Sequence, residues 1–329
     1  MSTNAARVLE TKKNLTALRV EAQNVKNSSP KLGEKTMAVH PEDITLMFAA
    51  EMCNEHLKQG IRINNKIKAY QRMYGMNHPV VVDDLLPFAA EFFESKELAT
   101  KRLQTIVKKH RLTKRLRLIK GLGDYTIGLI MGHMKSIYVI DDETGEKRPK
   151  FATPAALAVY AGVGVKYGLK VSKTNLNRIR ERQYEELGNK DFGFNTDFAG
   201  RMYAASDNLL KATNGWFKHH YDQLRLRLTE RCINNDETFV ATAEDQKASK
   251  GKMQEGRRYI KGRKNQSIEA FTHSNAKTRI ARILLHLIYT EWMTLEGLEP
   301  RIPYPIEYLG HNKLITLDEV IEFDTRKKN

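Results

Sequence analysis

Two glycines in the stretch from Leu118 to Met131, Gly121 and Gly123, constrain the fold more than any other feature of this sequence. The stretch reads apolar-x-Gly-apolar-Gly, then a polar residue, then small and apolar residues at helical spacing. Glycine adopts backbone angles that side chains forbid, and it lets another group approach the bare backbone. The pattern predicts a tight turn between two helices, as in a helix-hairpin-helix element.

The turn is flanked in the way that an anion-binding turn requires. A densely basic run at 108–117 precedes it, and a helix is expected to begin directly after it. The first N–H groups of a helix have no partner inside the helix, and they favour a negative charge. We expect Gly121, Gly123 and the amide of Asp124 to hold a phosphate. A plain turn between two core helices is the alternative.

The overall charge points to an anionic partner. The 329 residues contain 55 Lys and Arg against 39 Asp and Glu, a formal net charge of +16. Such an excess describes partners and not the fold, and nucleic acid is the first candidate. The side chains expected to neutralise phosphates are Arg115, Arg117, Lys120, Lys170, Lys173, Arg178, Arg257, Arg258 and Arg263.

Other classes of protein fit the sequence poorly. No run approaches the ~20 apolar residues that span a bilayer, so no membrane partner is expected. The first ten residues lack a secretory apolar core. The sequence has only two cysteines, a count that excludes a disulfide framework, and Cys53 and Cys232 lack the spacing of paired ligands, which argues against a structural zinc site. We therefore expect a cytoplasmic, nucleoid-associated protein whose partner is DNA.

The predicted fold is mostly α, a helical bundle with the helix-hairpin-helix element and a small β-hairpin insertion near residues 137–149. A start signal at His40-Pro41 predicts a long helix, which would pair with another helix or another subunit, and a homo-oligomer is expected. Leu314–Leu317 resembles a short strand. The predicted parts are a flexible, helix-prone arm at 1–38, a long-helix dimerisation or scaffold region at 39–117, the hairpin-containing domain at 118–298 and a tail at 299–329.

Residues 234–267 lie inside the predicted hairpin-containing domain but differ from it in composition. The segment is polar, poor in large apolar groups and rich in Lys and Arg. Two interpretations are open: a solvated linker or loop, and a nucleic-acid-binding loop that becomes ordered on contact.

The order of pieces from Leu118 to Leu298 resembles the C-terminal transposase domain of the Piv-type DNA invertases and the bridge-RNA-guided insertion-sequence transposases. The resemblance is specific over Ile119–Val163, where the turn is followed by Phe151-x-Thr-Pro-x-x-Leu-Ala-x-Tyr-Ala-Gly-Val. It is looser afterwards, through the aromatic segment Trp216–Tyr221 and a late helix. It implies a DNA-binding scaffold, and a guide RNA would fit the resemblance as well.

In that family an N-terminal RNase-H-like domain carries acidic residues that bind magnesium, and a serine nucleophile follows the Ala-Gly segment. This sequence departs on both counts, because residues 1–110 read as helices and the expected Ser-Gly pair is missing. Ser172 is the nearest serine and the one candidate nucleophile. An active recombinase would use Ser172, magnesium and acidic residues from among Asp83, Asp84, Asp141 and Asp142.

The first interpretation is therefore a DNA-backbone-binding protein related to that transposase domain. The active, metal-assisted recombinase is the second. A structural protein that coats nucleic acid without sequence preference is the third. No helix presents an obvious set of Arg and Asn residues for reading bases, and no cofactor is expected unless the chain is catalytic.

Overall fold

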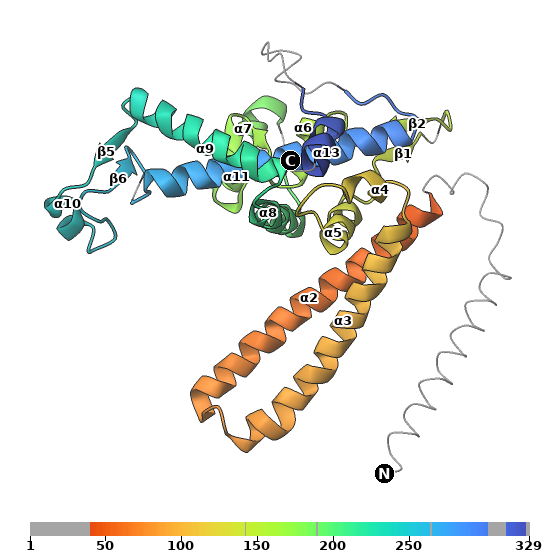
Figure 1. Cartoon of the computed structure of the whole chain (residues 1–329), viewed down its shortest axis with the longest axis horizontal. Helices are drawn as coiled ribbons and strands as arrows, with labels where there is room; N and C mark the ends of the chain where they lie inside the picture. The colour runs from red at the N-terminus through yellow and green to blue at the C-terminus, as the bar shows by residue number, and fades with distance from the viewer. Residues whose placement is uncertain (1–39, 142, 189, 264, 302–313, 327–329) are drawn as a thin grey trace.

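The computed structural model describes residues 40–141, 143–188, 190–263, 265–301 and 314–326 (Figure 1). The described chain is mostly helical, with small antiparallel strand pairs, as the sequence predicted. The expected arm at 1–38 lies outside the described residues, as does much of the expected tail.

A long helical hairpin extends from one side of the molecule (Figure 1). Helix α2 (Pro41–Tyr74) runs out, a π-helical turn at Val80–Leu85 reverses the chain, and α3 (Leu86–Lys109) returns along α2. The predicted start is confirmed: His40 caps α2 by accepting from the Glu42 amide at 3.4 Å. The long helix pairs with another helix of the same chain.

The main core forms where the base of this hairpin meets further helices. A single apolar cluster joins Leu46 and Ala50 of α2 to fully buried side chains such as Trp292. Helix α2 crosses α5 closely at Gly132. The glycine makes this crossing possible, because a Cβ at that position would lie 2.1 Å from the Ala50 Cβ. Four of the helices that share this core with α2 and α3 are α5 (Asp124–Met134), α8 (Thr196–Lys211), α9 (Trp216–Asn234) and α11 (Ile268–Leu295).

Short strand pairs and small helices connect these elements. The predicted β-hairpin is confirmed as β1 (Tyr138–Ile140) paired with β2 (Lys147–Pro149), and Asp141 closes its turn by accepting from the amides of the next residues. The remaining elements of this region are α4 (Thr113–Leu116), α6 (Pro154–Tyr160), β3 (Val165–Lys166), β4 (Leu169–Lys170) and α7 (Leu176–Leu187).

The segment at 234–267 is a folded lobe in this structure and not the expected loop or linker. It forms β5 (Thr238–Val240), α10 (Ala243–Ala248) and β6 (Arg258–Ile260), with β5 and β6 paired antiparallel. Tyr259 is buried with Ala241 and Met253 in a core of its own. A few buried apolar side chains therefore order a segment whose composition is otherwise that of a linker.

The strand expected near Leu314–Leu317 is also corrected. Leu317–Thr325 forms helix α13, and Thr316 caps it by accepting from the Glu319 amide at 3.2 Å. Val320 is fully buried in the main core. The cap and the core contact select a helix, although the apolar run alone resembled a strand.

Candidate nucleic-acid interface

The turn between α4 and α5 exposes its backbone. Ile119 and Leu122 are buried in the core, whereas Gly121 and Gly123 are exposed. Gly123 is the N-cap residue of α5, and a Cβ placed on it would meet no other atom within 4 Å. The space in front of the start of α5 is therefore open to an approaching molecule.

The two glycines serve different purposes. Gly121 has φ +85°, a conformation that side chains rarely adopt. A Cβ there would also lie 2.8 Å from the carbonyl oxygen of Asn208 and 2.9 Å from the Cα of Leu209, both on α8. Gly121 thus permits the turn to pack on α8, and Gly123 keeps the backbone accessible.

The first amides of α5 are available to an anion. The amide of Ile127 donates to the Gly123 carbonyl at 3.0 Å, which begins the helical pattern. Within the described parts of the chain, no group accepts from the amides of Asp124, Tyr125 or Thr126. These N–H groups lie at the positive end of the helix dipole.

Arg115 and Arg117 are not the free cations that the sequence led us to expect. Arg115 pairs with Glu291 of α11, Nη1 to Oε2 at 2.7 Å, and with Asp318 of α13. Arg117 Nε donates to Asp124 Oδ1 at 2.7 Å. The carboxylates that pair with Arg115 come from distant helices, and the one that pairs with Arg117 begins the next helix. Of the three expected cations at the turn, only Lys120 has a side chain with no acidic partner among the described residues.

A cavity of about 330 Å³ lies directly beside the turn. Lys120, His219 and Arg326 border it, together with Phe323 and the residues 213–215 that precede α9. One buried carboxylate organises its wall. Asp324 of α13 accepts from the Lys120 amide at 2.8 Å and from the amide of Trp216 at 2.7 Å. The helix α13 therefore fixes the turn against α9.

The loop after α6 is also built around hydrogen bonds. Lys170 Nζ donates to Thr278 Oγ1 at 2.9 Å and lies 5.4 Å from the centre of the Tyr203 ring. Ser172 Oγ accepts from the Asn175 amide at 3.3 Å and caps the 3₁₀ turn that follows. Among the described residues no basic or acidic side chain hydrogen-bonds the Ser172 hydroxyl. Its observed role is that of a cap.

The remaining expected cations lie elsewhere on the molecule. Arg257 pairs with Glu269 at 3.3 Å, Arg258 donates to Thr238 Oγ1 at 3.0 Å, and Arg263 stacks over Phe271. All three belong to the lobe at 234–267, which lies at the far end of α9 and α11 from the turn (Figure 1). Lys173 is exposed in the turn before α7, and Arg178 is exposed on α7 itself. The structure therefore divides the expected residues among three places.

The acidic residues considered for magnesium do not come together. Asp83 and Asp84 lie in the π-helical turn at the far end of the α2–α3 hairpin, and Asp141 lies in the β1–β2 turn (Figure 1). Asp142 is outside the described residues. In the part of the chain that is described, no three His, Cys, Asp or Glu side chains form a group that could hold a metal ion.

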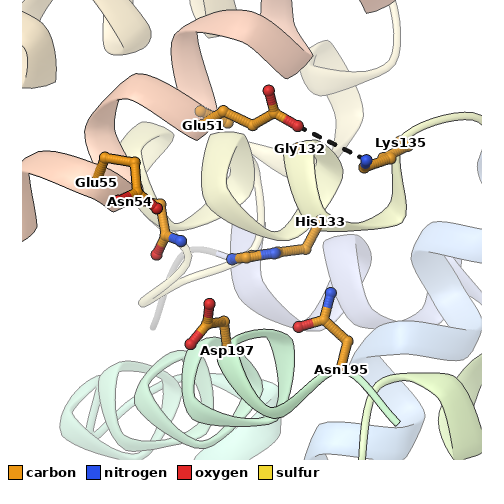
Figure 2. Close-up of a pocket in the computed structure, with 9 residues that line it drawn as sticks. Glu51, Asn54, Glu55, Gly132, His133, Lys135, Asn195 and Asp197 are labelled. Carbon is orange, nitrogen blue, oxygen red and sulfur yellow. Dashed lines mark ion pairs between the residues drawn. The ribbon is translucent and has the colours of Figure 1, made fainter. Parts of the chain in front are cut away.

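A second cavity, of about 310 Å³, separates α2, α5 and α8 (Figure 2). Its charged lining is largely paired: Glu51 with Lys135 at 3.7 Å, and Asp197 with a lysine of α2 at 2.8 Å. His133 points into it, and burial, followed by the charge of Arg201, lowers the pKa of this imidazole to about 4. None of the residues expected to bind nucleic acid lines this cavity.

Sequence reasoning gave no role to four of the arginines on the core helices α9 and α11: Arg227, Arg231, Arg279 and Arg282. Their spacing of four and three residues along each helix was the available signal, because such spacing places both members of a pair on one helical face. Arg279 and Arg282 were expected on the exposed side of their helix, and the structure exposes Arg279 but leaves Arg282 half-buried.

Comparison of the chain with protein-family models, with curated proteins and with solved structures finds no match. Across the described ranges, none of the helices combines the length and the apolar character that crossing a membrane would require.

Proposed function

We propose that this protein binds the phosphodiester backbone of DNA through a helix-hairpin-helix element formed by α4, the Gly121–Gly123 turn and α5. The observation that carries the proposal is the open backbone at Gly123, in front of amides that no other described group occupies. A phosphate there would accept from the amides and face the positive end of α5. Lys120, which borders the cavity beside the turn, would supply further positive charge.

We infer that the surrounding domain is related to the transposase domain that the sequence resembles, and that the protein acts as a scaffold and not as a nuclease. The capping role of Ser172 supports binding over catalysis. Backbone contacts position a protein on a duplex without reading its sequence. Association with the nucleoid, and with a guide RNA beside DNA, are parts of this proposal.

The test is a salt series of binding to labelled duplex DNA. Gly123→Val should weaken binding at least tenfold, since hydrogen bonds to a charged group contribute about 1.5–3 kcal/mol. The matched control is Gly193→Val, the same substitution at a second exposed glycine with open space around it. It should bind as the wild type does.

Lys120→Gln should reduce the slope of log affinity against log salt by about 0.9 for one phosphate. Lys66→Gln on the exposed face of α2 controls for the lost charge. Competition with duplex and single-stranded RNA in the same assay identifies the preferred nucleic acid. Equal affinities for wild type and Gly123→Val at every salt concentration would refute the proposed site.

A further inference from the structure

Two pairs of arginines lie on helices that pack against each other. Arg227 and Arg231 are four residues apart on α9, and Arg279 and Arg282 are three apart on α11. Residues at these spacings are neighbours on one face of a helix. The helices α9 and α11 lie side by side through the core (Figure 1) and share apolar contacts, including those of Cys232 with the start of α11.

The two pairs form one cluster. Burial lowers the pKa of the Arg279 guanidinium, and the positive charges of Arg231 and Arg227 lower it further. Burial and then the charge of Arg279 lower the pKa of Arg282 in the same way. These mutual effects agree with the packing of α9 against α11, in which Cys232, the residue after Arg231, contacts the start of α11.

Over the described ranges, none of the four guanidinium groups makes an ion pair, although Arg115, Arg257 and Lys277 all do. Like charges at these spacings destabilise a helix. Two of the four donate to carbonyl oxygens: Arg282 Nε to Val163 O at 2.5 Å, and Arg227 Nε to Gln223 O at 3.3 Å.

The loop after α6 lies against the same part of α11. Val163 at its start is held by Arg282, and Lys170 contacts Thr278, the residue before Arg279. The loop therefore borders the part of α11 that carries Arg279 and Arg282. Arg227, Arg231 and Arg279 are themselves exposed, so the cluster is accessible from solution.

We propose that Arg227, Arg231, Arg279 and Arg282, with the adjoining loop, form a second site for the phosphates of a nucleic-acid strand, separate from the hairpin turn. The planar guanidinium fork matches phosphate geometry and binds it through paired hydrogen bonds. Four such groups spread over two helices exceed what one small anion can occupy, and they suit a chain of phosphates. The choice of nucleic acid as the partner rests on the proposed function.

The test uses the full chain and the same salt series of DNA binding. The cluster variants are Arg227→Gln/Arg231→Gln and Arg279→Gln. The control is Arg62→Gln/Lys66→Gln, which removes the same formal charge as the double variant from exposed positions of α2 that make no ion pair among the described residues. We expect the double cluster variant to bind at least tenfold more weakly than this control, with a salt slope reduced by about 0.9 for each phosphate lost.

A urea midpoint measured on each variant separates binding from folding. Removal of unmatched positive charges should leave the midpoint unchanged or raise it. A lower midpoint, or a loss of affinity no larger than that of the control, would overturn the inference. Displacement of DNA by poly-glutamate at equal charge concentration would overturn it too, since the partner would then be an acidic protein.

The two proposals can fail separately. If Gly123→Val weakens binding and the cluster variants do not, only the second site is wrong. If the cluster variants weaken binding and Gly123→Val does not, the hairpin is wrong and the arginine cluster stands. If neither Gly123→Val nor the cluster variants weaken binding, both proposals are wrong.

Discussion

The clearest test of the geometry at the turn is to add one methyl group at each of its two glycines. In Gly121→Ala the new Cβ would lie 2.8 Å from the Asn208 carbonyl oxygen, in a residue with φ +85°. The left-handed backbone costs a side-chain-bearing residue about 1–2 kcal/mol, and forcing atoms into a packed site costs about 1–3 kcal/mol. We expect Gly121→Ala to lower the free energy of unfolding by about 2–5 kcal/mol.

In Gly123→Ala the same methyl group enters open space, and the backbone already has φ −78°. Reduced freedom of the unfolded chain would stabilise the variant by about 0.4–1 kcal/mol, and a poorer helix N-cap offsets a similar amount. We therefore expect no more than about 0.5 kcal/mol of change in either direction.

The assay is urea unfolding followed by circular dichroism, with midpoints compared at an unchanged slope of free energy against urea. Gly193→Ala serves as the control for an alanine at an open, exposed glycine. Equal midpoints for Gly121→Ala and Gly123→Ala would refute the assigned packing of the turn on α8. Because Gly121→Ala is expected to be less stable, the DNA affinity of this variant is compared with the wild type only under conditions in which both are folded.

Three further predictions follow from the described contacts. Asp324→Ala should destabilise the fold by about 2–4 kcal/mol, because the two amides that its carboxylate accepts from would be left without a partner; a urea midpoint equal to that of the wild type would contradict this. Burial lowers the pKa values of His133 and His286 to about 4, below the value near 6.5 of the unfolded chain. Protons therefore bind the unfolded chain preferentially, and stability that is full above pH 6.5 should fall between pH 6.5 and 4. The slope should approach about 1.4 kcal/mol per pH unit for His286 and be smaller for the less buried His133. Urea midpoints measured across this range should lose part of their pH dependence in His286→Leu. Finally, Met76 and Phe88, 69% and 64% exposed near the far end of the α2–α3 hairpin, are expected to contact a second copy of the chain. Sedimentation equilibrium should show a homo-oligomer that Met76→Lys/Phe88→Lys weakens, and a monomeric wild type would contradict this expectation.

Local signals in the sequence determined much of the secondary structure. His40 and Pro41 begin α2, Thr153 caps α6 through the Ala156 amide, and Asp141 closes the turn between β1 and β2. Each of these interactions joins residues within a few positions of one another. Their pattern can therefore be read directly from the order of the side chains.

Tertiary structure alone decided which residues of the candidate site are available. Arg115 is paired with carboxylates that lie 176 and 203 positions away, and the lobe at 234–267 is ordered by the burial of Tyr259 with Ala241 and Met253. The arginine pairs lie on neighbouring helices because α9 and α11 pack together, and a glycine is required at position 121 because α8 crosses the turn. A sequence shows which side chains carry charge, but only the packing of distant segments sets which charges are matched and which backbone is left open.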